Sequence, residues 1–137
     1  LLVVVAIIDI LAKLASAAYS SANRKVRDGR RVSDMRQVQT ALELYFAESR
    51  GYPNGTNLAL GKTGAKQLSS VSGFNDTPGA SEIVFMQKVP TDPVPSAPDY
   101  VYTLGSPATT YSITFTLEGP TGPFAEGPHT VTQAGIN

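Results

Sequence analysis

The feature that most constrains this chain is its first fourteen residues, Leu1–Leu14 (LLVVVAIIDILAKL), an almost unbroken apolar run that opens a long helix. All ten prolines lie at or after Pro53, so nothing in the sequence breaks the helix before the Gly51-Tyr52-Pro53 turn. A helix of about 50 residues would be about 75 Å long. A chain of 137 residues cannot cover such a helix with its own core, so we expect the first half to be buried in something else.

The apolar residues of this run point in every direction around the helix, which disfavours an ordinary amphipathic core helix. About 20 apolar residues span a membrane, and only Asp9 and Lys13 interrupt residues 1–23. Lipid and a bundle of identical helices are therefore both suitable surroundings. A cleaved secretory signal is a third alternative, because Ala15-Ser16-Ala17 has the small residues of a cleavage site, although no basic region precedes it. The predicted assembly or membrane segment comprises Leu1, Leu2, Val3, Val4, Val5, Ile7, Ile8, Asp9, Ile10, Leu11, Lys13 and Leu14.

Asp9 and Lys13 are the two charges inside this segment, and a charge in hydrocarbon costs at least about 2.5 kcal/mol. Their i,i+4 spacing, with the acid first, favours an ion pair within one helix. In one interpretation the two groups only neutralise each other. In the other they pair between neighbouring helices and fix the register of an assembly. The sequence leaves both interpretations open.

Residues 24–50 continue the helix with a single apolar stripe, which indicates that this part packs on a globular head. The stripe recurs at steps of three and four, at Val32, Met35, Val38, Leu42, Tyr45 and Phe46. Gly29 is the expected soft point of the helix, where a gentle bend or local melting is predicted, because glycine costs about 1 kcal/mol relative to alanine. A basic collar follows the apolar run and suits anionic lipid or acidic surfaces of neighbouring copies; it consists of Arg24, Lys25, Arg27, Arg30 and Arg31.

Residues 51–137 form the predicted head, because the composition shifts there to the Gly, Pro, Ser, Thr and Asn of turns. The clearest strand is 111–117, where large apolar residues alternate with Ser and Thr, and residues 100–104 are expected to pair with it in an antiparallel hairpin. The remaining predictions are a short helix around Ala65–Val71, a buried segment of ambiguous type at 83–86 and an edge strand at His129–Gln133. A small antiparallel sheet on the amphipathic half of a long helix gives an α+β fold.

The composition offers little for catalysis. Cysteine is absent, which excludes disulfides, thiolate metal sites and thiol catalysis, and His129 is the single histidine. The net charge of zero removes any global electrostatic argument for nucleic acid or an acidic substrate. No nucleophile and base, phosphate loop or metal triad is recognisable, so we predict that the chain is not an enzyme and has no cofactor.

Two pairs of head residues are weaker site predictions. Asp92 and Asp99 bracket a proline-rich loop and could offer oxygen ligands to calcium, against the simpler interpretation of two solvated loop acids. Asn54 and Asn75 each begin an Asn-x-Thr sequence, the acceptor pattern for glycosylation.

These elements, in this order, resemble type IV pilins, and in particular the major pseudopilins of type II secretion. LLVVVAIIDILAKLASAAY is similar to the N-terminal segment of the family, and Tyr19 matches its tyrosine. RRVSDMRQVQTALELYFAESRGYP resembles the polar helix that ends in a Gly-Tyr-Pro turn, and KVPTDP followed by YVYTL resembles the proline-rich loop and first strands of the heads. The resemblance covers nearly the whole chain, and it is most specific in the N-terminal segment.

The chain also departs from the family pattern. The usual start, with its glutamate, does not precede Leu1, so either the sequence lacks about five residues or the subunit manages without them. Asp9 replaces a glycine, and we predict that it takes over the pairing of that glutamate. Ala17 stands where many members have a helix-breaking proline. The cysteine pair of many pilins is absent, which favours a pseudopilin-like or cysteine-free head.

The resemblance implies a structural subunit that is stored in the inner, or cytoplasmic, membrane and is extracted by pilus or secretion machinery into a helical filament of its own copies. The filament would be a surface pilus or a periplasm-spanning pseudopilus, and calcium near Asp92 and Asp99 would fit the family. The alternative is a monomeric, membrane-anchored, extracytoplasmic binding module. Neither interpretation involves nucleic acid.

Overall fold

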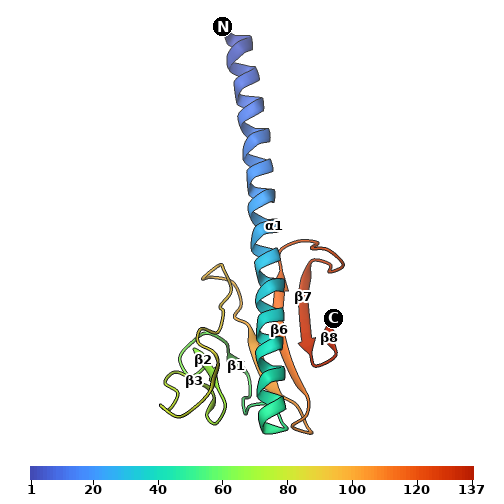
Figure 1. Cartoon of the computed structure of the whole chain (residues 1–137). Coiled ribbons are helices and arrows are strands. Elements are labelled where there is room, and N and C mark those ends of the chain that lie inside the picture. The colour runs from blue at the N-terminus through green and yellow to red at the C-terminus, as the bar shows by residue number, and fades with distance from the viewer.

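The computed structural model describes residues 1–137 as one long helix followed by eight short strands. The helix, α1 (Leu2–Ser49), precedes two antiparallel sheets, which confirms the α+β class. Figure 1 shows α1 as a single rod whose N-terminal half projects beyond the head and whose other half lies in front of β6 (Tyr111–Leu117). The chain is therefore a head with a projecting helix.

α1 is continuous across Gly29, so the predicted local melting there is wrong. Asp28 and Arg31 on either side of the glycine are buried against the head, and their contacts outweigh a helix propensity cost of about 1 kcal/mol. The helix ends where Arg50 adopts the left-handed conformation, with φ 56°, and its N–H donates to the Phe46 carbonyl at 2.7 Å. The predicted end at the Gly51 turn is therefore confirmed.

The apolar stripe on the second half of α1 packs on the head as predicted. Five of its six residues are buried, and Phe46 is partly buried against the same core. The head contributes the other large side chains of this core, among them three wholly or almost wholly buried tyrosines. The buried members from the head include Tyr52, Leu60, Leu68, Phe74, Val89, Tyr100, Tyr102, Tyr111, Ile113, Phe115, Leu117 and Val131.

The larger sheet has five strands in the order β1-β5-β6-β7-β8. Its strands are β1 (Leu58–Ala59), β5 (Val101–Leu104), β6, β7 (Gly127–Thr132) and β8 (Gly135–Ile136). The predicted hairpin is confirmed, since β5 pairs antiparallel with β6 and Leu104 lies opposite Tyr111. The prediction of an edge strand at His129–Gln133 is wrong in its position, because β7 lies between β6 and β8.

A smaller sheet contains β2 (Gln67–Ser69) between β3 (Gly73–Asn75) and β4 (Val84–Met86). The predicted short helix around Ala65–Val71 is therefore wrong. β2 has partners on both sides and buries Leu68 completely, and this pairing decides its conformation. Strands of three residues are too short to display an alternating pattern in the sequence.

Candidate functional site: the free helix and its anchor in the head

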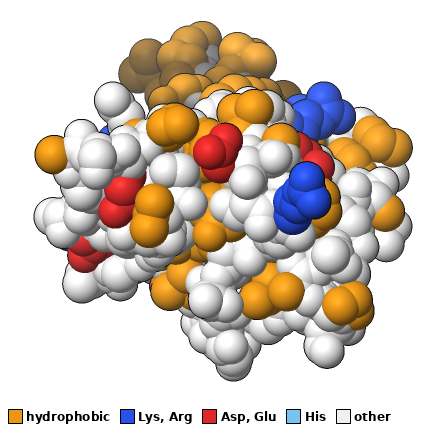
Figure 2. Space-filling model, turned by 60° about the horizontal axis from the view of Figure 1, so that its bottom comes forward, with side chains coloured by type: hydrophobic (Ala, Val, Ile, Leu, Met, Phe, Trp, Pro, Cys, Tyr) orange, Lys and Arg blue, Asp and Glu red, His pale blue; other side chains and the backbone are white.

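The free half of α1 presents a long apolar surface. The ten large apolar side chains of the predicted assembly segment are between 52% and 100% exposed. α1 is long and apolar enough to cross a membrane, with a mean hydropathy of 2.1 over its most apolar stretch, although a secretory signal has the same profile. In Figure 2 the projecting helix lies behind the head and is orange, whereas the apolar side chains of the head form separate patches. Exposed apolar surface of this extent marks a membrane or protein contact.

Asp9 and Lys13 form an ion pair within the helix, with 2.8 Å between Asp9 Oδ2 and Lys13 Nζ. Their side chains are 61% and 74% exposed, so neither group is buried by the contact. The intrahelical pairing predicted from the i,i+4 spacing is present. Pairing between neighbouring helices stays a prediction.

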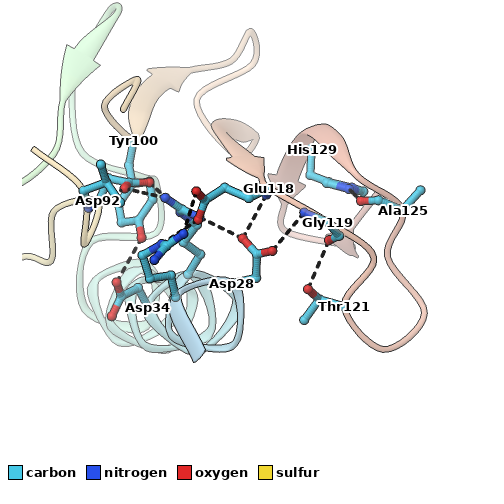
Figure 3. Close-up of polar contacts among 12 residues, drawn as sticks. Asp28, Asp34, Asp92, Tyr100, Glu118, Gly119, Thr121, Ala125 and His129 are labelled. Atoms are coloured by element: carbon cyan, nitrogen blue, oxygen red, sulfur yellow. Dashed lines mark hydrogen bonds and ion pairs between the residues drawn. The ribbon is translucent and has the colours of Figure 1, made fainter. Parts of the chain in front are cut away.

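Arg31 lies at the centre of a buried ionic network where α1 leaves the head, and Figure 3 labels its acidic partners Asp28, Asp92 and Glu118. Its Nε and Nη2 donate to the two carboxylate oxygens of Asp92 at 2.7 and 2.8 Å, and its Nη1 donates to Asp28 at 2.8 Å and to Glu118 at 2.7 Å. The side chains of Arg31 and Asp28 are 1% exposed and that of Asp92 is 5% exposed. Bonding to Asp92 raises the pKa of Arg31, so the guanidinium is permanently charged.

The network joins three segments of the chain. Asp28 accepts hydrogen bonds from the backbone N–H groups of Glu118 at 2.9 Å and Gly119 at 3.0 Å, just beyond the end of β6. Arg27 makes a two-point contact with Glu118, at 2.7 and 3.0 Å, and this bond is the main reason that the pKa of Glu118 is lowered to about 2. Arg31 also binds Asp92, in a separate loop of the head. The base of the free helix is therefore bound both to the end of β6 and to this loop.

A further polar contact lies one turn along the helix. Tyr100 donates its hydroxyl proton to Asp34 Oδ2 at 3.0 Å, and both residues are buried. Burial raises the pKa of both groups. The contact continues the line of buried bonds between α1 and the head, so the direction in which the free helix projects is fixed by several independent contacts.

The network changes the interpretation of the basic collar. Arg27 and Arg31 bind carboxylates of their own chain, whereas Arg24, Lys25 and Arg30 remain exposed. Sequence reasoning missed this because the partners of Arg31 lie 61 and 87 residues away. The only local signal was the Asp28–Arg31 spacing of three residues, which is common on solvated helices.

The two predicted calcium ligands contact different cations. Both carboxylate oxygens of Asp92 accept hydrogen bonds from Arg31, and Asp92 also accepts one from the Val94 N–H at 2.8 Å. Asp99 instead forms an ion pair at the surface with Lys62 at 3.4 Å. No group of three His, Cys, Asp or Glu side chains is placed to hold a metal ion. The interpretation of Asp92 as a solvated acid is wrong, because its side chain is 5% exposed. Calcium binding stays a prediction. A calcium ion at Asp92 would have to displace Arg31.

The two glycosylation candidates differ in accessibility. Asn54 is exposed at the turn after the helix. Asn75 uses its Nδ2, the atom that would carry the sugar, to donate to Ser69 Oγ and to the Gly73 carbonyl, both at 2.8 Å. The fold therefore presents Asn54 for modification and holds Asn75 in the sheet.

The single histidine lies within β7 and makes contacts to the backbone. His129 Nδ1 is 2.8 Å from the Asn137 carbonyl and Nε2 is 2.7 Å from the Ala125 carbonyl, while Phe115 and Phe124 pack against the ring. The single N–H of a neutral imidazole donates to one of these two carbonyls, so the ring contacts the backbone of the C-terminal region. No pocket is found on the protein surface.

A scan against protein-family models finds no match, and searches of curated proteins and of solved structures find none. The long apolar helix and the antiparallel head are compatible with a pilin-like fold.

Proposed function

We propose that this chain is a structural, pilin-like subunit that polymerises through its N-terminal helix into a helical filament, either a surface pilus or a secretion pseudopilus. One observation carries the proposal: half of a continuous helix of 48 residues is largely apolar and exposed, and buried ion pairs join its base to a head. A filament needs a surface that many copies can bury together, and it needs every copy to hold that surface at the same angle. The Arg31 network supports the second requirement.

The same helix supports storage in the cytoplasmic membrane before assembly, because it is long enough to span the hydrocarbon layer. Transfer from lipid to a helix bundle brings little net hydrophobic gain, since both surroundings are apolar. Assembly then depends on packing and on polar contacts that set register. The proposed partners are other copies of the chain, the membrane and a pilus or secretion machinery, and we propose no catalytic function and no cofactor.

Electron microscopy of the purified full chain tests the proposal. We expect filaments when detergent is removed, and only monomers from a variant that lacks residues 1–14, which lie outside the head and are exposed. The variant is a matched control because its head keeps all of its core. Monomers or irregular aggregates from the full chain would refute the proposal.

The exposed helix also supports a second candidate, a membrane-anchored binding module with an extracytoplasmic head. In that case the full chain would enter liposomes on detergent removal and remain a single copy per anchor. Chemical cross-linking in liposomes and the filament yield without lipid separate the two functions. A binding module should give monomers in liposomes and no filaments, whereas a filament subunit should give filaments without lipid.

A further inference from the structure

Asp9 and Lys13 lie on the side of α1 that faces the head. An α-helix returns to the same side after 18 residues, which is about five turns. Asp9 precedes Arg27 by 18 residues, and Lys13 precedes Arg31 by the same number. Because Arg27 and Arg31 both bind the head, the exposed Asp9–Lys13 pair faces the space beyond the head on that same side.

Two serines extend this side of the free helix. Ser16 follows Lys13 by three residues and Ser20 by seven, spacings that keep side chains on one helix face. We call Asp9, Lys13, Ser16 and Ser20 the polar stripe; all four are exposed. The composition of the free helix indicates a uniformly apolar surface. Its structure instead has one polar side, which lies in line with the head.

The half of α1 that packs on the head also has an uncovered surface, on the side that faces away from the head. We call this surface the back face; its exposed residues are Gly29, Ser33, Thr40, Leu44 and Ala47. Leu44 is 52% exposed although this half of the helix has a buried apolar side of its own. Small residues on the back face permit close approach of another helix.

Two charged residues border the back face and have free bonding capacity. Arg36 is exposed and has no ion-pair partner within the chain. Glu43 is exposed, and its side chain accepts only the Tyr52 hydroxyl at 2.9 Å. The spacing of seven residues between Arg36 and Glu43 places both on one flank of the helix.

The head determines what can reach the polar stripe. Two parallel copies cannot bring their stripes together at one level, because each stripe lies in line with its own head and the two heads would overlap. A second copy must be displaced along the helix axis by about the length that the head covers. Residues 24–49 span about 39 Å at ~1.5 Å per residue. At that displacement, the stripe of one copy lies level with the back face of the other.

The charges match at this displacement. Asp9 becomes level with Arg36 after a shift of 27 residues, about 40 Å, and Lys13 becomes level with Glu43 after about 45 Å. The difference of about 5 Å is within the reach of long lysine and arginine side chains. Opposite charges therefore meet at about the displacement that the head requires.

We propose that the polar stripe of one copy packs on the back face of a second, parallel copy displaced by about 40 Å, with Asp9 paired to Arg36 and Lys13 to Glu43. This contact rests on the proposed filament function and names the two surfaces that build it. It joins different surfaces of identical chains, so it does not close on itself and repeats without limit. It also provides partners for Asp9 and Lys13 once the helix is buried.

Cysteine cross-linking tests the contact, and the chain has no cysteine of its own. Ser16 and Leu44 become level at a shift of 28 residues, about 42 Å, so filaments of the Ser16→Cys, Leu44→Cys variant should give a ladder of disulfide-linked multimers on mild oxidation. Within one chain the two residues are equally far apart and cannot bond. The control is Ala18→Cys with Leu44→Cys, because Ala18 lies on the other side of the free helix, and it should stay monomeric.

Charge reversal provides a second test. Asp9→Lys and Arg36→Glu should each lower the fraction of protein that sediments as filaments at least about tenfold, and the double variant should restore it to within about threefold. Intrahelical pairing cannot explain a rescue, because Arg36 is about 40 Å from Asp9 in the same chain. Both residues are exposed, so the melting temperature of the head should not change.

The outcomes separate this contact from the proposed function. Two results would overturn the contact and leave the filament function standing. One is filaments that cross-link in the control variant and not in the Ser16→Cys, Leu44→Cys variant; the other is a double charge-reversal variant that does not recover filaments. Absence of filaments from the unaltered chain would overturn the function and the contact with it. A ladder specific to Ser16 and Leu44, together with rescue, would establish both.

Discussion

Replacing Arg31 by methionine should destabilise the head by about 3–5 kcal/mol, the usual cost of removing one partner from a buried ion pair. The guanidinium makes four hydrogen bonds to three carboxylates, and its side chain is 1% exposed. The loss is not shared equally. Asp28 keeps two backbone N–H groups and Glu118 keeps Arg27, whereas Asp92 keeps only the Val94 N–H. The buried carboxylate of Asp92 therefore accounts for most of the expected cost.

Urea unfolding of the full chain in detergent measures this loss. The chain has no tryptophan and six tyrosines, so near-ultraviolet circular dichroism follows the packing of the buried tyrosines directly. Arg30→Met is the matched control, because the neighbouring Arg30 side chain is 61% exposed and lies 3.9 Å from Asp34. It should cost less than about 1 kcal/mol. Arg31→Lys should fall between the two, since an ammonium cannot make the planar two-point contact to Asp92.

A free energy of unfolding for Arg31→Met within about 1 kcal/mol of that of the unaltered chain would contradict this prediction, and so would an equal loss in Arg30→Met. Either result would mean that water or a side-chain shift compensates the carboxylates, and that the network does not fix the base of the helix. The intermediate variant keeps the test informative if Arg31→Met does not fold, because a partial loss is still expected for it.

Three further predictions concern the head. Bonding to Arg27 lowers the pKa of Glu118 from 4.5 to about 2, so its contribution to stability is complete above about pH 4.5 and is lost as the pH falls toward 2; Glu118→Gln should flatten the pH dependence of unfolding in this range. Any N-linked sugar should be found on Asn54 and not on Asn75, because the Asn75 Nδ2 is hydrogen-bonded within the sheet. Intact mass measurement followed by peptide mapping tests this, and a sugar on Asn75 would contradict it. Calcium followed by chelator should leave the melting temperature unchanged, because Asp92 is already bound to a guanidinium; a rise with calcium that the chelator reverses would show a metal site.

The long helix and the main hairpin could be predicted because their signals are local. An apolar run without proline, an apolar stripe at steps of three and four, and the alternation in 111–117 each lie within one element. These patterns do not depend on the rest of the chain. The structure confirms the helix within two residues of its predicted end and confirms the pairing of β5 with β6.

The short strands and the position of β7 could not be predicted for the opposite reason. β2 is three residues long, and its conformation depends on partners in β3 and β4. The sequence of 65–71 has no strong local preference, so pairing decided its structure against the predicted helix. β7 matches the predicted strand, but whether it lies at the edge depends on β8, which has only two residues.

The need of half of a long helix for apolar surroundings outside its own head follows from the amino-acid sequence, because periodicity and the absence of proline are properties of adjacent residues. The tertiary structure alone decided that Arg27 and Arg31 of the basic collar turn inward, since Glu118 is 91 and 87 residues away from them. The tertiary structure also showed that the Asp9–Lys13 pair lies on the side of the free helix that faces the head. A helical pattern defines sides of a helix, but only packing against the head shows which side is covered and where the charged pair is left free.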